Sequence, residues 1–229
     1  MTQPRLRRAV VFDLDGTLVD TIGDLAAALN RTLAEVDLPP HPESTVRTMV
    51  GGGLAKLLER ALAAHGAVLD APEQDTARAR LFAHYAADPA ARSKLYPGVG
   101  ETLAVLAGTG IACGIFTNKP ETIARDLVHA LGIAEAFEAI QGSETGFPKK
   151  PDPAGLAHLV AELGAVPETT LMVGDSSTDL DTARAAGLKR VVVVSHGYSV
   201  TLVTELGADA VINQFHEFVP SLALLGSER

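Results

Sequence analysis

The stretch RAVVFDLDGT (residues 8–17) joins a short apolar run to a polar turn that carries two carboxylates. An apolar run of this length that ends in acidic residues and a glycine is typical of a buried parallel strand. If the strand continues through the motif, side-chain alternation places Asp13 and Asp15 on one side, where their charges repel each other. A hard divalent cation, Mg²⁺ first, would relieve that repulsion. An Asp-Gly turn that merely leaves a strand is the alternative for this stretch taken alone.

Similar apolar runs recur along the chain and alternate with helical patterns, as in sheets built from βαβ units. The expected strands are residues 8–12, 111–116, 139–141, 171–173, 191–194 and 210–212, and a helix is expected over 101–107. This alternation predicts an α/β fold with a doubly wound, Rossmann-like parallel sheet.

The long interval between the first two expected strands indicates an insertion, because a βαβ unit needs only about 30 residues. Two apolar stripes with helical spacing lie in this interval, and a third helix is expected over 76–87. The stripes are Ile22, Leu25, Leu29, Leu33 and Val36, and Leu54, Leu57, Leu58 and Leu62. We therefore expect residues 20–92 to form a small helical domain, and residues 1–19 with 93–229 to form the α/β core.

Composition limits the possible partners and the compartment. The 229 residues include 19 Lys and Arg against 28 Asp and Glu, a net charge of −9, which disfavours binding to nucleic acid. No apolar run approaches the roughly 18 residues of a membrane span. Arg5, Arg7 and Arg8 precede an apolar run too short for an export signal. The lone Cys113 allows no disulfide within the chain and no cysteine zinc cage, so we expect a cytoplasmic protein.

Polar side chains also follow other expected strands. Thr117 and Asn118 come after the second strand and precede a helix, where backbone amides could hold an anion. Asp175 and Asp179 follow a buried run and open a helix, and Lys150 stands before a proline between these two places. Each feature alone has a structural alternative, namely a helix cap, a carboxylate at a helix N-terminus or a solvated lysine. Their combination at strand ends, where α/β sheets bind ligands, predicts a site.

Taken together, these motifs resemble those of the haloacid dehalogenase superfamily of phosphatases, over essentially the whole chain. The motifs are Asp13-Leu14-Asp15-Gly16-Thr17, Thr117-Asn118, Lys150 ahead of Pro151, and Gly174-Asp175 with Asp179. The resemblance implies that the α/β core is the core of that superfamily, and that the helical insertion is its mobile cap.

The resemblance also implies a reaction, the Mg²⁺-dependent hydrolysis of a small phosphate monoester. Asp13 would be the nucleophile that becomes phosphorylated, Asp15 the general acid and base, and Lys150 a cation that offsets negative charge. The carboxylates of Asp13 and Asp175, with the backbone carbonyl of Asp15, would hold the metal ion, while Asp179 would orient Lys150 or a metal-bound water. The residues expected to contact the substrate are Thr117, Asn118, Gly16 and Thr17. Members that displace halide lack the second carboxylate, so Asp15 favours ester hydrolysis.

The expected substrate is 2-phosphoglycolate, because Val50-Gly51-Gly52-Gly53 resembles the glycine-rich cap loop of phosphoglycolate phosphatases. Arg47 or Lys56 beside these glycines would bind its carboxylate, and the alternative is that both are solvated. Another small phosphate, such as a sugar phosphate or pyrophosphate, and a sugar phosphomutase reaction stay open. So does a phospho-accepting, receiver-like signalling module, although receiver domains are shorter. We expect a monomer or a homodimer, with no nucleic-acid or membrane partner.

Overall fold

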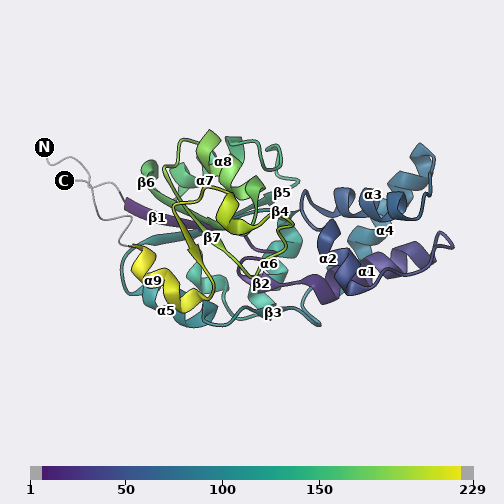
Figure 1. Cartoon of the computed structure of the whole chain (residues 1–229), viewed down its shortest axis with the longest axis horizontal. Helices are drawn as coiled ribbons and strands as arrows, with labels where there is room; N and C mark the ends of the chain where they lie inside the picture. The colour runs from purple at the N-terminus through teal and green to yellow at the C-terminus, as the bar shows by residue number, and fades with distance from the viewer. Residues whose placement is uncertain (1–6, 223–229) are drawn as a thin grey trace, which may run out of the picture.

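The computed structural model describes residues 7–222, which form an α/β core with a group of helices beside it (Figure 1). The core sheet has six parallel strands in the order β5-β4-β1-β6-β7-β8. The strands are β1 Arg7–Phe12, β4 Ala112–Pro120, β5 Ala139–Ser143, β6 Ala165–Gly174, β7 Arg190–Val194 and β8 Ala210–Ile212. This topology confirms the predicted α/β fold with a Rossmann-like parallel sheet.

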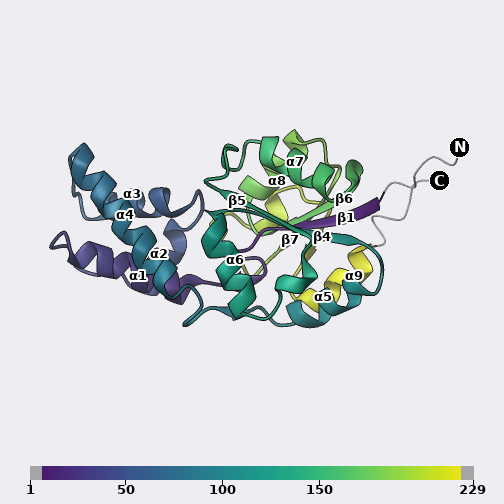
Figure 2. The ribbon, with the colours of Figure 1, turned by 180° about the vertical axis from the view of Figure 1, so that it is seen from behind.

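Helices cover both faces of the sheet (Figure 2). They are α5 Val99–Ala107, α6 Glu121–Ala130, α7 Ala154–Glu162, α8 Ser177–Ala185 and α9 Phe218–Ser221, and short 3₁₀ turns lie at Ala134–Ala136, Val203–Glu205 and Phe215–Glu217. Val10 and Phe12 of β1 belong to the apolar cluster with α5, α6 and α9. Ala9 and Val11 belong to the cluster with α7 and α8. Both faces of β1 are therefore buried, which is why its sequence is continuously apolar.

The observed strands occupy the expected places but differ in length. β4 continues to Pro120 instead of ending at Phe116, so Thr117 and Asn118 lie in the strand and not in a turn after it. Conversely, β1 ends at Phe12 and does not continue through the acidic motif. Both differences change where the side chains of the motifs point.

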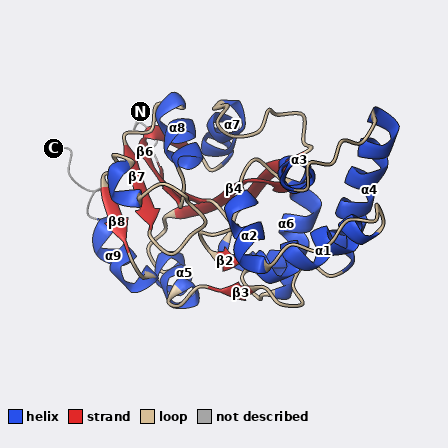
Figure 3. Cartoon of the chain, turned by 45° about the vertical axis from the view of Figure 1, so that its right-hand side comes forward, coloured by secondary structure: helices blue, strands red, loops and turns tan. Residues whose placement is uncertain are grey.

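Beside the core, four helices pack into a second apolar cluster, which Ile123 and Tyr198 of the core join (Figure 3). They are α1 Ile22–Ala34, α2 Glu43–Met49, α3 Leu54–Ala64 and α4 Ala71–Ala87, and we call residues 22–87 the helical insert. The expected third helix starts earlier than predicted, because Asp70 and Glu73 form a capping box. Val36, the last residue of the first predicted stripe, lies beyond the end of α1, and α2 was not predicted from the sequence.

Two very short strands connect the insert to the core. β2 Val19–Asp20 leads into α1, and β3 Lys94–Leu95 returns from α4. They pair antiparallel, with Val19 opposite Leu95. The chain therefore leaves and re-enters the core at one place. Within the described residues, no helix is long and apolar enough to cross a membrane.

Candidate active site

The predicted polar motifs meet at one edge of the sheet, since the carboxyl ends of parallel strands lie together. Asp13 follows β1, and its backbone N–H donates to the carbonyl of Val173 in β6 at 2.8 Å. Asp175 follows β6 directly, and Thr117 lies near the end of β4. A cavity of about 490 Å³ opens here, lined by this edge and by residues 50–54, 56, 57 and 60 of the helical insert.

Lys150 is the centre of a buried ion-pair cluster. Its Nζ lies 2.8 Å from Oδ1 of Asp13 and 2.6 Å from Oδ1 of Asp179. Only 3% of the Lys150 side chain is exposed. Burial acts to lower the pKa of Lys150, but the two carboxylates outweigh it and raise the pKa above its ordinary value. Lys150 therefore stays charged beside the predicted nucleophile.

Asp179 holds this cluster in place with both of its carboxylate oxygens. While Oδ1 accepts from Lys150, Oδ2 accepts from the backbone N–H groups of Asp175 and Ser176, both at 3.2 Å, and from the Ser176 hydroxyl at 2.7 Å. The carboxylate is fully buried. Asp179 therefore fixes Lys150 and the start of α8 together.

Asp175 sits in a tight cradle. Its Oδ2 accepts from the backbone N–H of Tyr198 at 2.6 Å. A Cβ added to Gly197 would lie 2.2 Å from the Cβ of Asp175. Gly16, at φ +83°, turns the chain away, and a Cβ there would lie 2.6 Å from Oδ2 of Asp175. These glycines leave only enough space for the carboxylate.

The carboxylates of the cluster carry more negative charge than Lys150 balances. Ligand oxygens of Asp13, Asp175 and Asp179 all lie within 4.8 Å of one another. The pKa of Asp13 is raised to about 7. Burial makes the largest contribution to this rise, Lys150 acts against it, and the charge of Asp179 adds to it. Burial, and then the charges of Asp179 and Asp13, raise the pKa of Asp175 well above its ordinary value. A buried set of oxygen ligands with excess negative charge fits a divalent cation.

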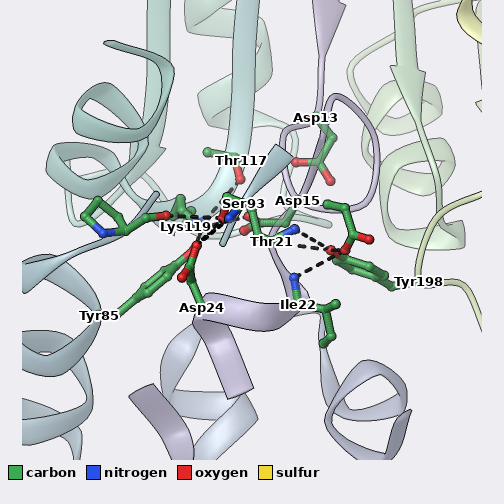
Figure 4. Close-up of polar contacts among 12 residues, drawn as sticks. Asp13, Asp15, Thr21, Ile22, Asp24, Tyr85, Ser93, Thr117, Lys119 and Tyr198 are labelled. Carbon is green, nitrogen blue, oxygen red and sulfur yellow. Dashed lines mark hydrogen bonds and ion pairs between the residues drawn. The ribbon is translucent and has the colours of Figure 1, made fainter. Parts of the chain in front are cut away.

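Asp15 is separated from this cluster, contrary to the expectation from alternation. Because β1 ends at Phe12, the two carboxylates do not converge on one cation. The Oδ1 of Asp15 instead lies 2.7 Å from Nζ of Lys119, near the end of β4, and Nζ also contacts the hydroxyl of Tyr85 from α4 (Figure 4). Each acidic residue of the motif therefore has a lysine of its own.

The two residues expected to bind phosphate from β4 both line the cavity. The side chain of Asn118 makes a reciprocal pair with the backbone of Lys150: its Oδ1 accepts from the N–H at 2.8 Å, and its Nδ2 donates to the carbonyl at 3.2 Å. Thr117 Oγ1 accepts from the N–H of Lys119 at 3.2 Å. Asn118 therefore positions Lys150, while the Thr117 hydroxyl can still donate a hydrogen bond.

Gly16 and Thr17 do not line the cavity, contrary to what we expected for residues that contact substrate. Thr17 is fully buried, and its carbonyl lies 3.2 Å from Nε2 of His196. The turn that brings Asp15 toward Lys119 points both residues into the protein. Their observed contacts shape the turn.

Of the cations on the insert, Arg47 lies outside the cavity lining, where it pairs with Asp20 at 3.3 Å and covers the ring of Tyr198 at 4.8 Å. Lys56 lines the cavity but pairs with Glu59 at 2.7 Å. Sequence reasoning missed Arg60, which lines the cavity and donates through Nη1 to the carbonyls of residues 49, 50 and 51. The carboxylate expected to meet Arg47 would therefore find that cation already paired.

Lys119, Tyr85 and Tyr198 were also missed by sequence reasoning. Lys119 stands directly beside the predicted Thr117-Asn118 motif, and this adjacency was the one available signal. Tyr85 reaches the site from an element distant in the chain, so no local pattern marks it. Tyr198 belongs to the segment His196-Gly197-Tyr198, which resembles phosphoglycolate phosphatases, but this resemblance assigned no role to its side chain.

Comparison with known proteins gives consistent matches. The model of the haloacid dehalogenase-like hydrolase family matches residues 10–193. A phosphoglycolate phosphatase of Rhodospirillum rubrum is 49% identical over 212 residues, covering 91% of this chain and 88% of its own. One of Mesorhizobium japonicum is 41% identical and covers 95% of both chains. The crystal structure of a predicted phosphoglycolate phosphatase from Haemophilus somnus superposes with a TM-score of 0.87 at 30% identity, covering 94% of this chain and 97% of the other.

Proposed function

This chain belongs to the haloacid dehalogenase-like hydrolases, and from that premise we propose that it hydrolyses 2-phosphoglycolate through a phosphorylated aspartate. The observation that carries the proposal is the position of Lys150, whose ammonium group joins Asp13 to Asp179 at the sheet edge where Asp175 also lies. Relatives that align over most of this chain are phosphoglycolate phosphatases. The reaction class is therefore that of a phosphoric monoester hydrolase.

Asp13 is the proposed nucleophile. Its carboxylate attacks phosphorus, so that a bond forms between its oxygen and phosphorus while the bond to the ester oxygen breaks. The phosphate group of the substrate is a dianion, and Lys150, 2.8 Å from Asp13, offsets the repulsion between this group and the carboxylate of Asp13. The carboxylates of Asp13 and Asp175 and the backbone carbonyl of Asp15 would hold Mg²⁺. When bound, the metal ion supplies positive charge that stabilises the transferring phosphoryl group.

Asp15 is the proposed acid and base. It donates a proton to the leaving alkoxide, and its carboxylate then accepts a proton from the water that attacks phosphorus and releases Asp13. The side chain is 17% exposed, so it can reach both the leaving group and water. Thr117, which lines the cavity, would donate its hydroxyl hydrogen to the phosphate.

In this proposal the helical insert determines which substrate binds. Together with its connections to the core it forms residues 20–92, which act as a mobile cap over the cavity. Arg60, in place of Arg47, is the proposed partner of the glycolate carboxylate. Its Nη1 is fixed by three carbonyls, and no carboxylate within residues 7–222 lies at ion-pair distance from its guanidinium group. A second anion in the cavity would supply the missing partner.

The test is a panel of phosphate esters ranked by kcat/KM in Mg²⁺. We expect 2-phosphoglycolate to rank first and many phosphates to be released per chain, whereas a receiver-like module would be labelled once. Interconversion of glucose phosphates without phosphate release would favour a mutase. Arg60→Met should raise KM for 2-phosphoglycolate by about 10- to 100-fold, the value of a charged hydrogen bond, and spare p-nitrophenyl phosphate. Arg31→Met, outside the cavity lining, is the matched control.

We propose the cytoplasm as the compartment, because the lone Cys113 is buried and unpaired with any other cysteine in the chain. A reducing compartment suits such a protein. Gel filtration would distinguish between the two proposed oligomeric states, a monomer and a homodimer.

A further inference from the structure

A second buried lysine, Lys119, lies where the core meets the helical insert. Its side chain is 1% exposed, and its Nζ lies 2.7 Å from Oδ1 of Asp15. The ammonium also donates to the hydroxyl of Tyr85 and lies 4.4 Å from the centre of the Tyr85 ring. Figure 4 shows these side chains converging from the acidic motif, from β4 and from α4. Three segments distant in the sequence thus form one contact.

This arrangement fixes one oxygen of Asp15 and leaves the other available. A buried ammonium is costly unless it is paired and hydrogen-bonded, so Lys119 and Asp15 stabilise each other's position. Within residues 7–222, the hydrogen bond and ion pair of the Asp15 carboxylate are both made through Oδ1, with Lys119. Oδ2 is therefore the oxygen that can exchange a proton with a leaving group or with water.

Tyr85 contributes from the insert, whereas Asp15 and Lys119 belong to the core. Burial, followed by the charge of Asp15, raises the pKa of Tyr85 well above its ordinary value, so the phenol remains neutral and accepts from the ammonium. The ring also lies against the ammonium of Lys119, whose side chain is 1% exposed. The contact is complete only when α4 lies against the core.

We propose that Lys119 is a positioning residue that holds Asp15 by Oδ1 for proton transfer through Oδ2, and that Tyr85 makes this arrangement depend on docking of the insert. The inference rests on the proposed function of Asp15. It assigns one lysine to each carboxylate of the motif, Lys150 to the nucleophile and Lys119 to the acid and base.

The experiment measures how kcat/KM depends on the leaving group. The aryl oxide of p-nitrophenyl phosphate leaves without being protonated, whereas the alkoxide of an alkyl phosphate needs a proton as it leaves. We expect Lys119→Met to lower kcat/KM about 10- to 100-fold for alkyl phosphates, part of the usual contribution of acid and base catalysis, and less than about threefold for p-nitrophenyl phosphate. Tyr85→Phe should also lower kcat/KM more for alkyl phosphates than for p-nitrophenyl phosphate, but by a smaller factor. The ratio of two substrates does not depend on the fraction of folded enzyme.

Two further variants make the result decisive. Asp15→Asn should show the steepest dependence on leaving group, and Lys119→Met should add little in the double variant, because both changes remove one function. Lys189→Met makes the same chemical change at an exposed position and should leave the dependence unaltered.

The outcomes separate this inference from the function on which it rests. Suppose that Asp15→Asn makes kcat/KM depend more steeply on the leaving group, while Lys119→Met lowers kcat/KM equally for all substrates. Lys119 is then merely structural and the inference is wrong. It is also wrong if Lys119→Met only raises KM for 2-phosphoglycolate relative to an ester without a carboxylate, since the lysine then binds substrate directly. If Asp15→Asn leaves the dependence unchanged, the acid and base role itself fails. Should Lys119→Met not fold, Tyr85→Phe decides: steepening supports the inference, and an unchanged dependence overturns it.

Discussion

Asp179→Asn tests how hydrogen bonds and opposing charges balance in the buried cluster of Lys150 with its neighbouring carboxylates. No orientation of an amide can replace this carboxylate, because Oδ1 accepts from Lys150 while Oδ2 accepts from three donors of residues 175 and 176. Whichever way the Asn side chain turns, its NH₂ group faces other donors. A buried group whose hydrogen bonds are lost in this way costs about 1–3 kcal/mol.

The charge removed by Asp179→Asn has two opposing effects. With an effective dielectric constant near 20, the contact with Lys150 at 2.6 Å is worth about 6 kcal/mol. Repulsion from Asp13 and Asp175, whose ligand atoms lie within 4.8 Å, amounts to about 7 kcal/mol on the same scale. At a pH high enough to ionise Asp13 and Asp175, these contributions nearly cancel. There we expect the metal-free protein to lose only the 1–3 kcal/mol of the amide mismatch, well below the roughly 3–5 kcal/mol for an ordinary broken buried pair.

The assay is urea unfolding in EDTA, followed by titration with Mg²⁺. The affinity for Mg²⁺ should fall about 10- to 100-fold, because one of three carboxylates near the ion is neutralised. The turnover number should also fall, since Lys150 keeps only Asp13 as an anchor. Asp181→Asn makes the same change at an exposed position of α8 and should alter neither quantity. A loss of about 5 kcal/mol in EDTA, or unchanged Mg²⁺ affinity, would refute this account of the cluster.

Four other predictions concern the same site. Asp13→Asn should remove turnover and leave the circular dichroism spectrum unchanged, and wild-type rates would show that another residue is the nucleophile. Activity should vanish in EDTA. Because burial raises the pKa of Asp13 from 3.8 to about 7, the metal-free folded state binds a proton that the unfolded chain has released. Stability in EDTA should therefore fall as pH rises from about 4 to 7, and Mg²⁺ should bind more weakly as pH falls below about 7. A pH-independent affinity between pH 5.5 and 8 would contradict this. Gly197→Ala should weaken Mg²⁺ binding, because its Cβ would lie 2.2 Å from the Cβ of Asp175, whereas at Gly100 an added Cβ meets nothing within 4 Å and serves as the control.

The sheet and its acidic strand ends were predictable because their signals are local. Residues 210–212 form β8 as expected, and Asp13 and Asp175 each follow an apolar run that the sequence displays directly. The capping box of Asp70 and Glu73 was equally local, and the pattern of an acidic residue three positions before a glutamate could have placed the start of α4.

What the sequence could not show depends on contacts between distant segments. Lys119 is a charged residue within the buried strand β4, whereas buried strands usually consist of apolar residues. Its ammonium is stabilised by Asp15, 104 positions away, and by Tyr85, 34 positions away. Likewise, β2 and β3 have two residues each, too short for any periodicity. Long-range pairing decides both features.

The antiparallel pairing of Val19 with Leu95 has an evolutionary consequence. Adjacent strands lie about 5 Å apart, so the two ends of the insertion are almost in contact. Any other bundle whose termini are equally close could be grafted at this position without disturbing the sheet. New selectivity can therefore be acquired by exchanging the graft, while the carboxylates and lysines beneath it stay unchanged.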